Sequence, residues 1–395
     1  MESQNSAAIA LIQRLNSLVA ELSSDDLSQA RETALGLSRQ LVITLQQPES
    51  ASVELMFGRV IPVAARIAIH LNLFKHISDS TSPLNSRALA ELSGAEELLI
   101  VRVLRPMAAM GFVKEVGERT WRATPITSAM ATEGIAAGHR FLGDMIIAAA
   151  NKATSYFKKY GPQCPTDPRD DLMQYAFQTK LTTFELLQSM PEVFKDFNMF
   201  MGNTVGNRGY WIDWFPIQEL LLDEATSQSV LLVDVGGGRG HDLVGFREKY
   251  PGQGRLILQD LPAVIDSISG LDPAIETMAY DFFTDQPVEG ARAYFYHHIF
   301  HDWSDVKCLE ILKGLKKAMK PGYSKLLIHD MIIPEQGASL FHSMLDMNMM
   351  VFNSGMERTE KQWGELISMA GLKVARFWTP PKKDADGIIE VILEP

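Results

Sequence analysis

Leu231-Leu-Val-Asp-Val-Gly-Gly-Gly-Arg-Gly-His241 is the stretch of sequence that decides the fold of this chain. Its apolar first half contains β-branched residues and is typical of a buried parallel strand. The strand leads into glycines at 236, 238 and 240, where the absence of a Cβ lets the backbone approach a ligand closely. Residues 241–250 are expected to form a helix whose N-terminal N–H groups face a carboxylate or phosphate. The stretch therefore predicts a strand–loop–helix junction that binds a nucleotide-like ligand.

The spacing of these glycines separates one nucleotide class from another. A dinucleotide fingerprint needs a small residue at its third position, which here is His241 or Leu243. A phosphate-binding P-loop needs Gly-Lys followed by Ser or Thr, and no such sequence follows. The pattern Asp-x-Gly-x-Gly-x-Gly from Asp234 instead resembles the S-adenosylmethionine (SAM) loop of class I methyltransferases. The resemblance implies SAM as cofactor, with Gly236 and Gly238 among its contacts.

Acidic residues also follow the next two expected strands. Asp260 ends the strand expected at 255–260, and doubly wound folds place an acid there on the ribose hydroxyls. Its alternative role is to begin the turn that leads to Pro262. Asp281 is placed to meet the adenine amino group, and Phe282 to cover the adenine ring. SAM carries a positive charge on its sulfonium, so a pocket lined by acids suits it.

Length, charge and cysteine content limit the class of protein. With 395 residues and 46% hydrophobic content, the chain can bury large cores and is expected to form two domains. A formal net charge of −11 argues against nucleic acid or an anionic membrane surface as partner. Cys164 and Cys308 form neither a disulfide framework nor a metal-ligand cluster, which indicates a reducing compartment. The start of the chain lacks the basic residues of a signal peptide, and Arg14 interrupts its apolar stretch too early for a membrane span. We expect a cytoplasmic protein.

The N-terminal part of the chain is expected to be helical and to end in a hairpin. Apolar residues recur at helical spacing in four segments, at 7–45, 59–74, 86–93 and 97–110. Residues 111–124 alternate as a β-hairpin with its turn at Gly117. Helices followed by a hairpin predict a winged helix. The segment 97–110 is mostly apolar, whereas a DNA-reading helix exposes polar side chains, so a dimerisation module is favoured over a DNA-binding one.

The reacting groups are expected after a later strand. Residues 291–303 predict a strand that delivers His301, Asp302 and Trp303 to its carboxyl end, where ligands of open α/β sheets gather. An imidazole accepts a hydroxyl proton at neutral pH, when a phenol with a pKa of about 10 remains protonated. A neighbouring carboxylate would hold the ring and stabilise the imidazolium. His297 and His301 have i, i+4 spacing, but this segment is read as a strand and lacks the His-Glu-x-x-His pattern, so no metal site is expected.

Three motifs make the resemblance specific. His301-Asp-Trp-Ser-Asp305, residues 326–334 and Met356-Glu-Arg-Thr359 resemble the plant caffeate-type O-methyltransferases and, more closely, their fungal secondary-metabolite relatives. The resemblance covers nearly the whole chain and implies His301 as general base, flanked by Asp330 and Glu357. The plant pattern has Glu where Asp330 stands. His297 replaces a lysine that lies near the cofactor in plant members.

The same resemblance implies the architecture. It is an α/β class I methyltransferase fold, a Rossmann-like doubly wound sheet, with an N-terminal, mostly α-helical winged-helix domain that forms a homodimer. We expect residues 1–196 to form the helical and winged-helix dimerisation domain and residues 197–395 to form the SAM-binding catalytic domain.

The acceptor pocket is less clearly marked. Methionine-rich segments at 197–201 and 341–352 would suit an apolar acceptor, although ordinary core packing is the more frequent explanation of such segments. The expected acceptor contacts are His139, Arg140, Met201, Asp302 and Met349. For the first two of these, a solvated helix face is the alternative.

Three functions compete. The first is a SAM-dependent O-methyltransferase that methylates a hydroxyl of a small aromatic, polyketide or enolic secondary metabolite. The second keeps SAM unconsumed as a fixed positive charge near a developing oxyanion and catalyses dehydration or a pericyclic reaction. The residues that motivate it are His139, Arg140, His297 and Asp330. The third, a winged-helix regulator that senses SAM, is disfavoured by the acidic charge. The sequence names neither the acceptor nor the methylated position.

Overall fold

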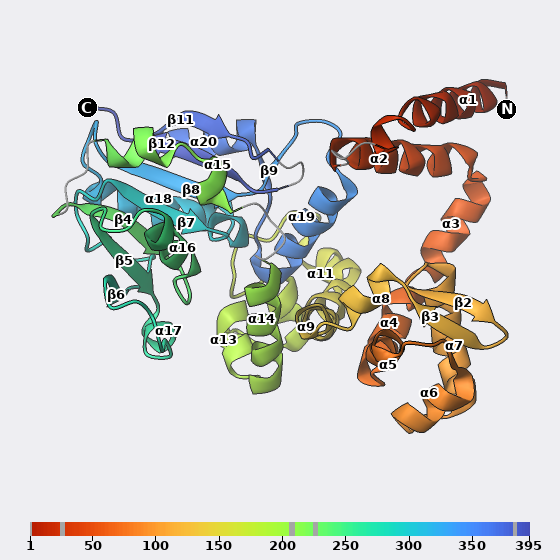
Figure 1. The fold of residues 1–395 in the computed structure, drawn as a ribbon. Helices are drawn as coiled ribbons and strands as arrows, with labels where there is room; N and C mark the ends of the chain where they lie inside the picture. The colour runs from red at the N-terminus through yellow and green to blue at the C-terminus, as the bar shows by residue number, and fades with distance from the viewer. Residues whose placement is uncertain (1, 24–27, 205–209, 224–227, 382–384) are drawn as a thin grey trace. The chain divides into compact units, whose positions relative to one another are not determined.

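Two units make up the chain, Met1–Ala131 and Thr132–Pro395. The computed structural model describes residues 2–23, 28–204, 210–223, 228–381 and 385–395 (Figure 1). The domain boundary expected between residues 196 and 197 is a functional one, between a dimerisation domain and a SAM-binding domain. That boundary stays a prediction. Within the described ranges, no helix is both long and apolar enough to cross a membrane.

The N-terminal unit is a set of helices around a small antiparallel sheet with the order β1-β3-β2. Its elements are α1 (Glu2–Ser17), η1 (Glu21–Ser23), α2 (Ser28–Leu45), α3 (Pro48–Phe57), α4 (Val60–His70), α5 (Leu73–Asp79), β1 (Leu84–Asn85), α6 (Ser86–Ser93), α7 (Glu97–Ala109), β2 (Val113–Gly117), β3 (Thr120–Ala123) and α8 (Pro125–Met130). The helix expected at 59–74 is divided at Asn72, whose φ is 53°. The hairpin turns where Gly117 predicts it. These elements confirm the winged helix.

The second unit begins with helices that pack on a later helix, α19 (Leu340–Asn353). They are α9 (Glu133–Phe141), η2 (Leu142–Ile147), α10 (Ala148–Ala150), α11 (Ala153–Tyr160), α12 (Leu172–Phe177), α13 (Thr183–Gln188) and α14 (Pro191–Thr204). Two further elements, α15 (Trp211–Trp214) and η4 (Gln218–Leu222), follow them and pack on the sheet instead. Gly138 of α9 lies against the ring of Phe200 on α14, and a Cβ there would fall 2.7 Å from that ring. Phe141 and Phe352 meet edge to face in the same core, with centroids 6.2 Å apart. The methionine-rich helix α19 therefore closes a hydrophobic core within this unit.

The rest of the second unit is built on a seven-stranded sheet with the order β11-β12-β8-β7-β4-β5-β6. Its strands are β4 (Val230–Val235), β5 (Arg255–Asp260), β6 (Ile275–Ala279), β7 (Ala293–His297), β8 (Lys325–Asp330), β11 (Lys373–Trp378) and β12 (Gly387–Ile392). The helices and short elements between them are α16 (His241–Lys249), α17 (Pro262–Ile265), η5 (Phe300–Asp302), α18 (Asp305–Ala318), β9 (Ile332–Ile333), β10 (Arg358–Thr359) and α20 (Glu360–Met369). Strands β4 to β8 run parallel, whereas β12 is antiparallel to both β8 and β11. The order reverses at β4, between β5 and β7, and this switch point is where doubly wound folds bind ligands.

Helices cover both faces of this sheet. Side chains of α18 and α20 pack with Tyr294 and Tyr296 on one face. On the other face α15 and α16 cover Phe295, whose ring stacks on Trp211 with centroids 4.6 Å apart. Successive residues of a strand point to opposite faces, so His329 and Asp330 at the end of β8 face different helical layers. The arrangement confirms the doubly wound α/β sheet predicted from the sequence.

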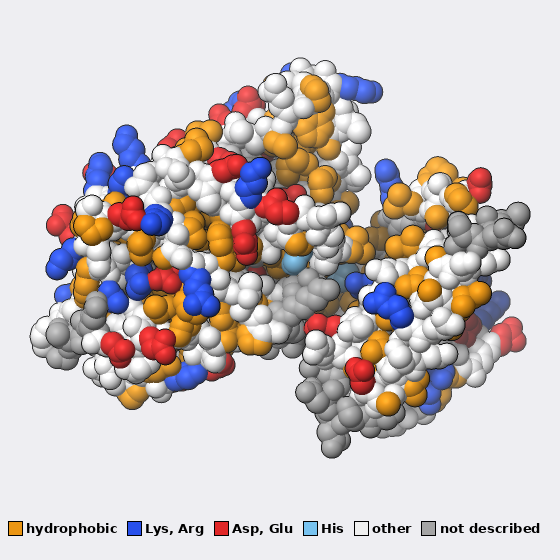
Figure 2. All heavy atoms as spheres, turned by 90° about the horizontal axis from the view of Figure 1, so that it is seen from above, with side chains coloured by type: hydrophobic (Ala, Val, Ile, Leu, Met, Phe, Trp, Pro, Cys, Tyr) orange, Lys and Arg blue, Asp and Glu red, His pale blue; other side chains and the backbone are white. Residues whose placement is uncertain are grey.

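Charged side chains are mixed on the part of the surface that Figure 2 shows. Acidic and basic side chains lie interspersed with hydrophobic ones there, and no large field of one sign forms. The expectation that nucleic acid is not a partner stays a prediction.

Candidate functional site

The glycine loop after β4 has the backbone that only glycine adopts without strain. Gly236, Gly238 and Gly240 have φ values of 72°, 58° and 76°. A Cβ on Gly236 would lie 2.6 Å from Ile299, and one on Gly237 would overlap the carboxylate of Asp234. The loop therefore leaves room for a ligand only because side chains are absent.

Asp234 supplies an unpaired buried carboxyl group beneath this loop. Its side chain is fully buried, and neither carboxylate oxygen has a hydrogen-bond partner among the described residues. Burial raises the pKa of Asp234 well above its usual value, and the nearby Asp242 raises it further. A buried carboxyl group without partners is costly, and a ligand with positive charge or N–H donors reduces that cost. The residues of the loop thus fit the cationic SAM molecule.

Asp260 and Asp281 both lie at the carboxyl edge of the sheet. Asp260 accepts hydrogen bonds from the backbone N–H groups of Gly238 and Leu261, at 2.9 and 2.7 Å. It thus ties the glycine loop to the start of the next turn, while burial raises its pKa. Asp281 follows the adjacent strand β6 and accepts from the N–H of Phe283 at 3.0 Å. Phe282 lies beside the glycine loop, 3.8 Å from where a Cβ of Gly236 would be.

His297 is held by an acid of α16. Its Nδ1 lies 2.8 Å from Oδ2 of Asp242, whose other oxygen accepts from the indole of Trp211 at 2.7 Å. Burial lowers the pKa of His297, but the charge of Asp242 outweighs burial and the net pKa is raised. The histidine that stands in place of a lysine is therefore protonated more readily than a free imidazole.

His301 forms a buried pair with Glu357. In η5, directly after β7, its Nδ1 lies 2.8 Å from Oε1 of Glu357, and its Nε2 lies 3.6 Å from Oδ1 of Asp302. Burial lowers the pKa of His301, but the charges of Glu357 and Asp302 raise it to about 10. Burial likewise raises the pKa of Asp302 to about 6. This is an imidazole oriented by one carboxylate, with its second nitrogen left for a ligand.

Asp330 makes no hydrogen bond to His301. It is fully buried at the end of β8, and its oxygens have no partner among the described residues. Burial raises its pKa to about 7, a tendency that the nearby charge of His301 only partly offsets. The two expected flanking acids therefore differ. Glu357 orients the ring of His301 by a hydrogen bond, whereas Asp330 acts on that ring only through electrostatic interaction.

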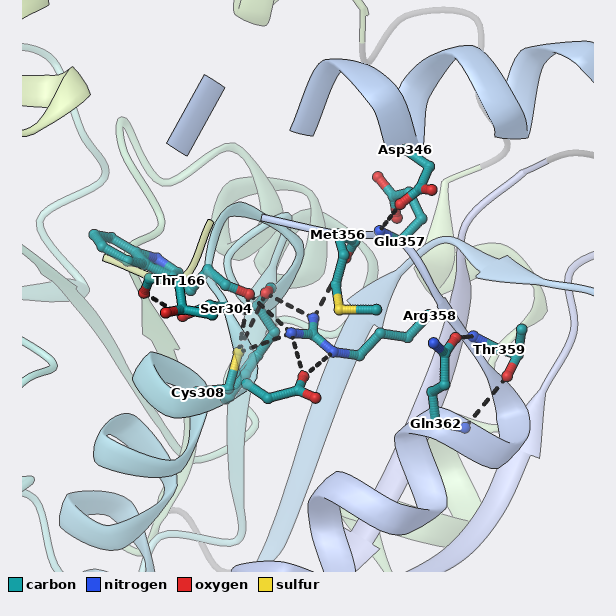
Figure 3. A network of polar contacts seen from close by, with 12 residues as sticks. Thr166, Ser304, Cys308, Asp346, Met356, Glu357, Arg358, Thr359 and Gln362 are labelled. Atoms are coloured by element: carbon teal, nitrogen blue, oxygen red, sulfur yellow. Dashed lines mark hydrogen bonds and ion pairs between the residues drawn. The ribbon is translucent and has the colours of Figure 1, made fainter. Parts of the chain in front are cut away.

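Arg358 fixes the backbone of the segment that carries His301, as Figure 3 shows. Its buried guanidinium donates to the carbonyls of Phe300 and Trp303, at 3.0 and 2.8 Å, and pairs with Asp305 at 2.8 Å. Glu357 and the neighbouring Arg358 have different partners, His301 and Asp305 respectively. Two consecutive residues where β10 begins thus have separate roles: Glu357 holds the ring of His301, and Arg358 holds the backbone around it.

The expected acceptor contacts lie mostly on three helices. His139 and Arg140 end α9, Met201 lies on α14 with 40% of its surface exposed, and Met349 lies half-buried on α19. The guanidinium of Arg140 is engaged by Asp196, at 2.6 and 2.9 Å. Roles for these residues stay predictions.

Sequence reasoning missed a second set of polar residues beside His301. His298 Nε2 lies 3.1 Å from Oδ2 of Asp386, which precedes β12. His297, His298 and Asp386 each offer an atom within 4.8 Å of the others, which is a geometry that could hold a metal ion. His329 pairs in register with His297, with ring centroids 4.2 Å apart. The sequence signal that could have pointed to Asp386 is its position in an Asp-Gly pair directly before the last apolar run of the chain. The expectation of no metal stays a prediction.

Two family models match the chain. The O-methyltransferase domain matches residues 174–373, and the O-methyltransferase dimerisation domain matches residues 53–133. The first model covers strands β4 to β8 and the segments with His301 and Glu357, and the second covers most of the winged helix.

Similar proteins agree with the models. The O-methyltransferase penC of Penicillium thymicola is 47% identical over 383 residues, which are 97% of this chain and 96% of that protein. The O-methyltransferase asqD of Emericella nidulans is 50% identical over 334 residues, 84% and 86% of the two chains. The solved structure of LepI in complex with SAM is 30% identical with a TM-score of 0.86, over 99% of this chain and 100% of that one. Another structure, called a pericyclic reaction enzyme, has the same identity and TM-score.

The comparisons confirm the family and the cofactor that the glycine loop and the His-Asp-Trp motif predicted. The match spans the sheet, the glycine loop and the helical N-terminal unit together. This chain belongs to the O-methyltransferase family and is a SAM-dependent O-methyltransferase.

Proposed function

We propose that His301 is the general base that removes the proton from the acceptor hydroxyl. The buried pair of His301 and Glu357 at the carboxyl edge of the sheet carries this proposal. A hydroxyl attacks poorly while it is protonated, and an imidazole within hydrogen-bond reach relieves that barrier. The acceptor is a small aromatic, polyketide or enolic secondary metabolite, which agrees with the methionine-rich helix α19 beside the site.

When bound, SAM supplies an electrophilic methyl group on a positively charged sulfur. Gly236, Gly238 and Asp260 position it, with Asp260 on the ribose hydroxyls and the unpaired Asp234 beneath the loop. Asp281 and Phe282 would take the adenine, and His297 would contact the cofactor with its ring. As the acceptor oxygen bonds to the methyl carbon, the bond between that carbon and the sulfonium sulfur would break and S-adenosylhomocysteine would leave. The hydroxyl proton would pass to Nε2 of His301, and Glu357 would stabilise the imidazolium at Nδ1.

The protonation of His301 depends on the state of the site. With a pKa raised to about 10, the ring is protonated in the ligand-free protein at neutral pH. A second positive charge close by lowers the pKa of an imidazole, because like charges disfavour the charged form. A sulfonium bound close by would therefore lower the pKa of His301 and favour the unprotonated ring that a general base needs.

The decisive experiment uses methyl-labelled SAM and a panel of phenols, catechols and enols. His301→Asn should keep SAM affinity within about threefold while turnover falls by about a hundredfold or more. His70→Asn, a substitution at an exposed histidine of the N-terminal unit, is the matched control and should match the wild type. Turnover of His301→Asn near the wild-type value would remove His301 from the role of base.

The alternative in which SAM is retained unconsumed has one supporting observation, the similarity to a structure called a pericyclic reaction enzyme. Two observations favour methyl transfer. The relatives at 47% and 50% identity are named O-methyltransferases, and Arg140 is already engaged by Asp196. One S-adenosylhomocysteine formed per product supports methyl transfer, and product without it supports the alternative.

The winged-helix unit is proposed to form a homodimer. Helix α3 has no buried side chain, and Leu55 and Phe57 on it are 80% and 66% exposed. Apolar surface of this kind is usually covered by a partner. Light scattering after gel filtration should give twice the chain mass, and Leu55→Lys with Phe57→Lys should shift it to the monomer.

A cytoplasmic location is proposed from the cysteine content alone, and microscopy of a fluorescent fusion tests it.

A further inference from the structure

A buried carboxylate far from His301 in the sequence is tied to the segment that carries Glu357. Asp171 has no exposed surface, and its Oδ2 accepts a hydrogen bond from the hydroxyl of Ser354 at 2.8 Å. Its Oδ1 accepts from the backbone N–H of Met173 at 2.8 Å, so the same side chain caps α12. One carboxylate therefore joins the start of α12 to the end of α19, across a sequence separation of 183 residues.

The segment between α19 and β10 lies directly against the backbone of His301. The N–H of Met356 donates to the carbonyl of His301 at 2.9 Å, and the side-chain amide of Asn353 donates to the carbonyl of Asp302 at 3.1 Å. A Cβ on Gly355 would collide with the carbonyl oxygen of His301. The position of this segment and the position of the His301 backbone are therefore coupled by direct contact.

Ser354 bends the chain so that Glu357 reaches the ring of His301. Its φ is 59°, a left-handed conformation that residues other than glycine seldom adopt unless surrounding structure imposes it. The hydrogen bond to Asp171 holds the side chain of Ser354 in this bend. Three residues later, Oε1 of Glu357 lies 2.8 Å from Nδ1 of His301, and the N–H of Glu357 donates to Asp346 at 2.9 Å. A shift of Ser354 would therefore move the carboxylate that orients the ring.

A second contact to the segment with His301 comes from the same loop ahead of α12. The carbonyl of Thr166 accepts a hydrogen bond from the hydroxyl of Ser304 at 2.8 Å, as Figure 3 shows. Ser304 stands directly before α18, three residues after His301. The loop at 166–171 therefore contacts two segments, one with the imidazole and the other with its carboxylate.

We propose that Asp171 is a positioning residue for methyl transfer, which acts through Ser354 to hold Glu357 and His301 in the geometry that proton transfer needs. This inference rests on the proposed function of His301. Catalytic groups must be held to within a fraction of an ångström, and a displacement of about 1 Å caused by a distant substitution costs about a hundredfold in rate.

Three variants test this link from its two ends. Ser354→Gly removes the hydroxyl and keeps the left-handed backbone, which glycine adopts without strain. Asp171→Ala removes the acceptor of that hydroxyl and the cap of α12 together. Asp171→Asn is the conservative variant, because an amide caps a helix and offers an N–H to the oxygen of Ser354. Burial raises the pKa of Asp171 to about 7, so a neutral side chain suits this site.

Two control variants reproduce the side effects of these changes elsewhere in the same unit. Gln178→Gly also replaces a left-handed residue, with φ 52°, at an exposed position at the other end of α12. Thr182→Ala removes the cap of the neighbouring helix α13. Both should keep kcat within about twofold of the wild type, because neither residue contacts the segments with His301 and Glu357.

The assay is transfer of label from methyl-labelled SAM across pH 6 to 10.5, together with calorimetric binding of SAM. Ser354→Gly and Asp171→Ala should lower kcat by about tenfold to a hundredfold, and their SAM affinity should stay within about threefold. The limb of the kcat/KM pH profile that reports His301 should move to lower pH, because a displaced Glu357 raises the pKa of the ring less. Asp171→Asn should keep kcat within about threefold of the wild type.

The pH profile separates positioning from mere stabilisation of the fold. Wild-type kcat and an unmoved limb in Ser354→Gly would overturn the inference. A loss of kcat that Thr182→Ala reproduces at an equal loss of unfolding free energy would also overturn it, because destabilisation would then explain the effect. An inactive His301→Asn beside an unaffected Ser354→Gly refutes only the role of Asp171, whereas turnover retained in His301→Asn refutes the proposed base itself.

Discussion

Glu357→Gln tests how the protein sets the proton affinity of His301. The carboxylate lies 2.8 Å from Nδ1 and is fully buried, so its charge acts on the ring with little screening. The rise in the pKa of His301 from 6.5 to about 10 corresponds to about 5 kcal/mol. An amide of the same shape keeps a hydrogen bond through its oxygen and removes only the charge.

We expect kcat of Glu357→Gln to fall by about a hundredfold to ten-thousandfold, because the imidazolium formed during transfer loses its partner. The limb of the kcat/KM pH profile that reports His301 should move to lower pH by about 1 to 3 pH units. The assay is initial-rate methyl transfer across pH 6 to 10.5. Glu360→Gln, at an exposed position of α20, is the control for loss of one negative charge. A limb that stays in place would refute the assignment of the raised pKa to Glu357.

Stability should follow the same pair. The folded pKa of His301 is raised, so its contribution to stability is fully present below pH 6.5 and is lost as pH rises through about 10. The difference in unfolding free energy between wild type and Glu357→Gln, measured in urea, should therefore shrink between pH 6 and pH 10. A difference that is constant with pH would contradict the linkage.

Four further substitutions have defined outcomes. Burial raises the pKa of Asp330 from 3.8 to about 7, so ionisation of this side chain destabilises the fold as pH rises through that range. Asp330→Asn should therefore raise the unfolding free energy at pH 8 by about 1–3 kcal/mol, measured in urea titrations. Gly237→Ala places a Cβ 2.6 Å from Leu258 and should weaken SAM binding by at least about tenfold in calorimetry. A Cβ on Gly238 would meet no atom within 4 Å, so Gly238→Ala should cost only about 1 kcal/mol of stability, through its positive φ. Arg358→Lys loses the forked contacts to the backbone around His301 and should lower the unfolding free energy by about 3–5 kcal/mol, with unchanged SAM affinity as the sign that the damage is local.

Local patterns predicted the elements that form the cofactor side of the site. The strand at 255–260 has the expected bounds, because an apolar run that ends in Asp-Leu-Pro limits both ends of a strand. The glycines at 236, 238 and 240 predicted a tight loop at this point, and their positive φ values are the backbone conformation that such a loop requires. These features depend on residues close together in the sequence.

Features that depend on distant pairing could not be predicted in the same way. Asp386 reaches His298 only because β12 pairs antiparallel with β8, and neither the pairing nor its register is encoded near Asp386. The unequal roles of Asp330 and Glu357 also needed coordinates, because the replacement of Glu by Asp at position 330 does not by itself say which acid contacts His301. Arg358 shows the same limit, since its partners come from the segment around His301.

The position of β12 affects how the protein is made. This strand lies between β8 and β11, yet it follows both in the sequence, so the whole apolar edge of β8 is bare until β12 leaves the ribosome. From Asp330 to Gly387 a ribosome takes roughly 3 to 11 s at 5–20 residues per second. An unpaired apolar edge is a template for aggregation during that interval. Soluble yield should therefore depend on translation speed and on chaperones that bind exposed strands, more than on the stability of the finished fold.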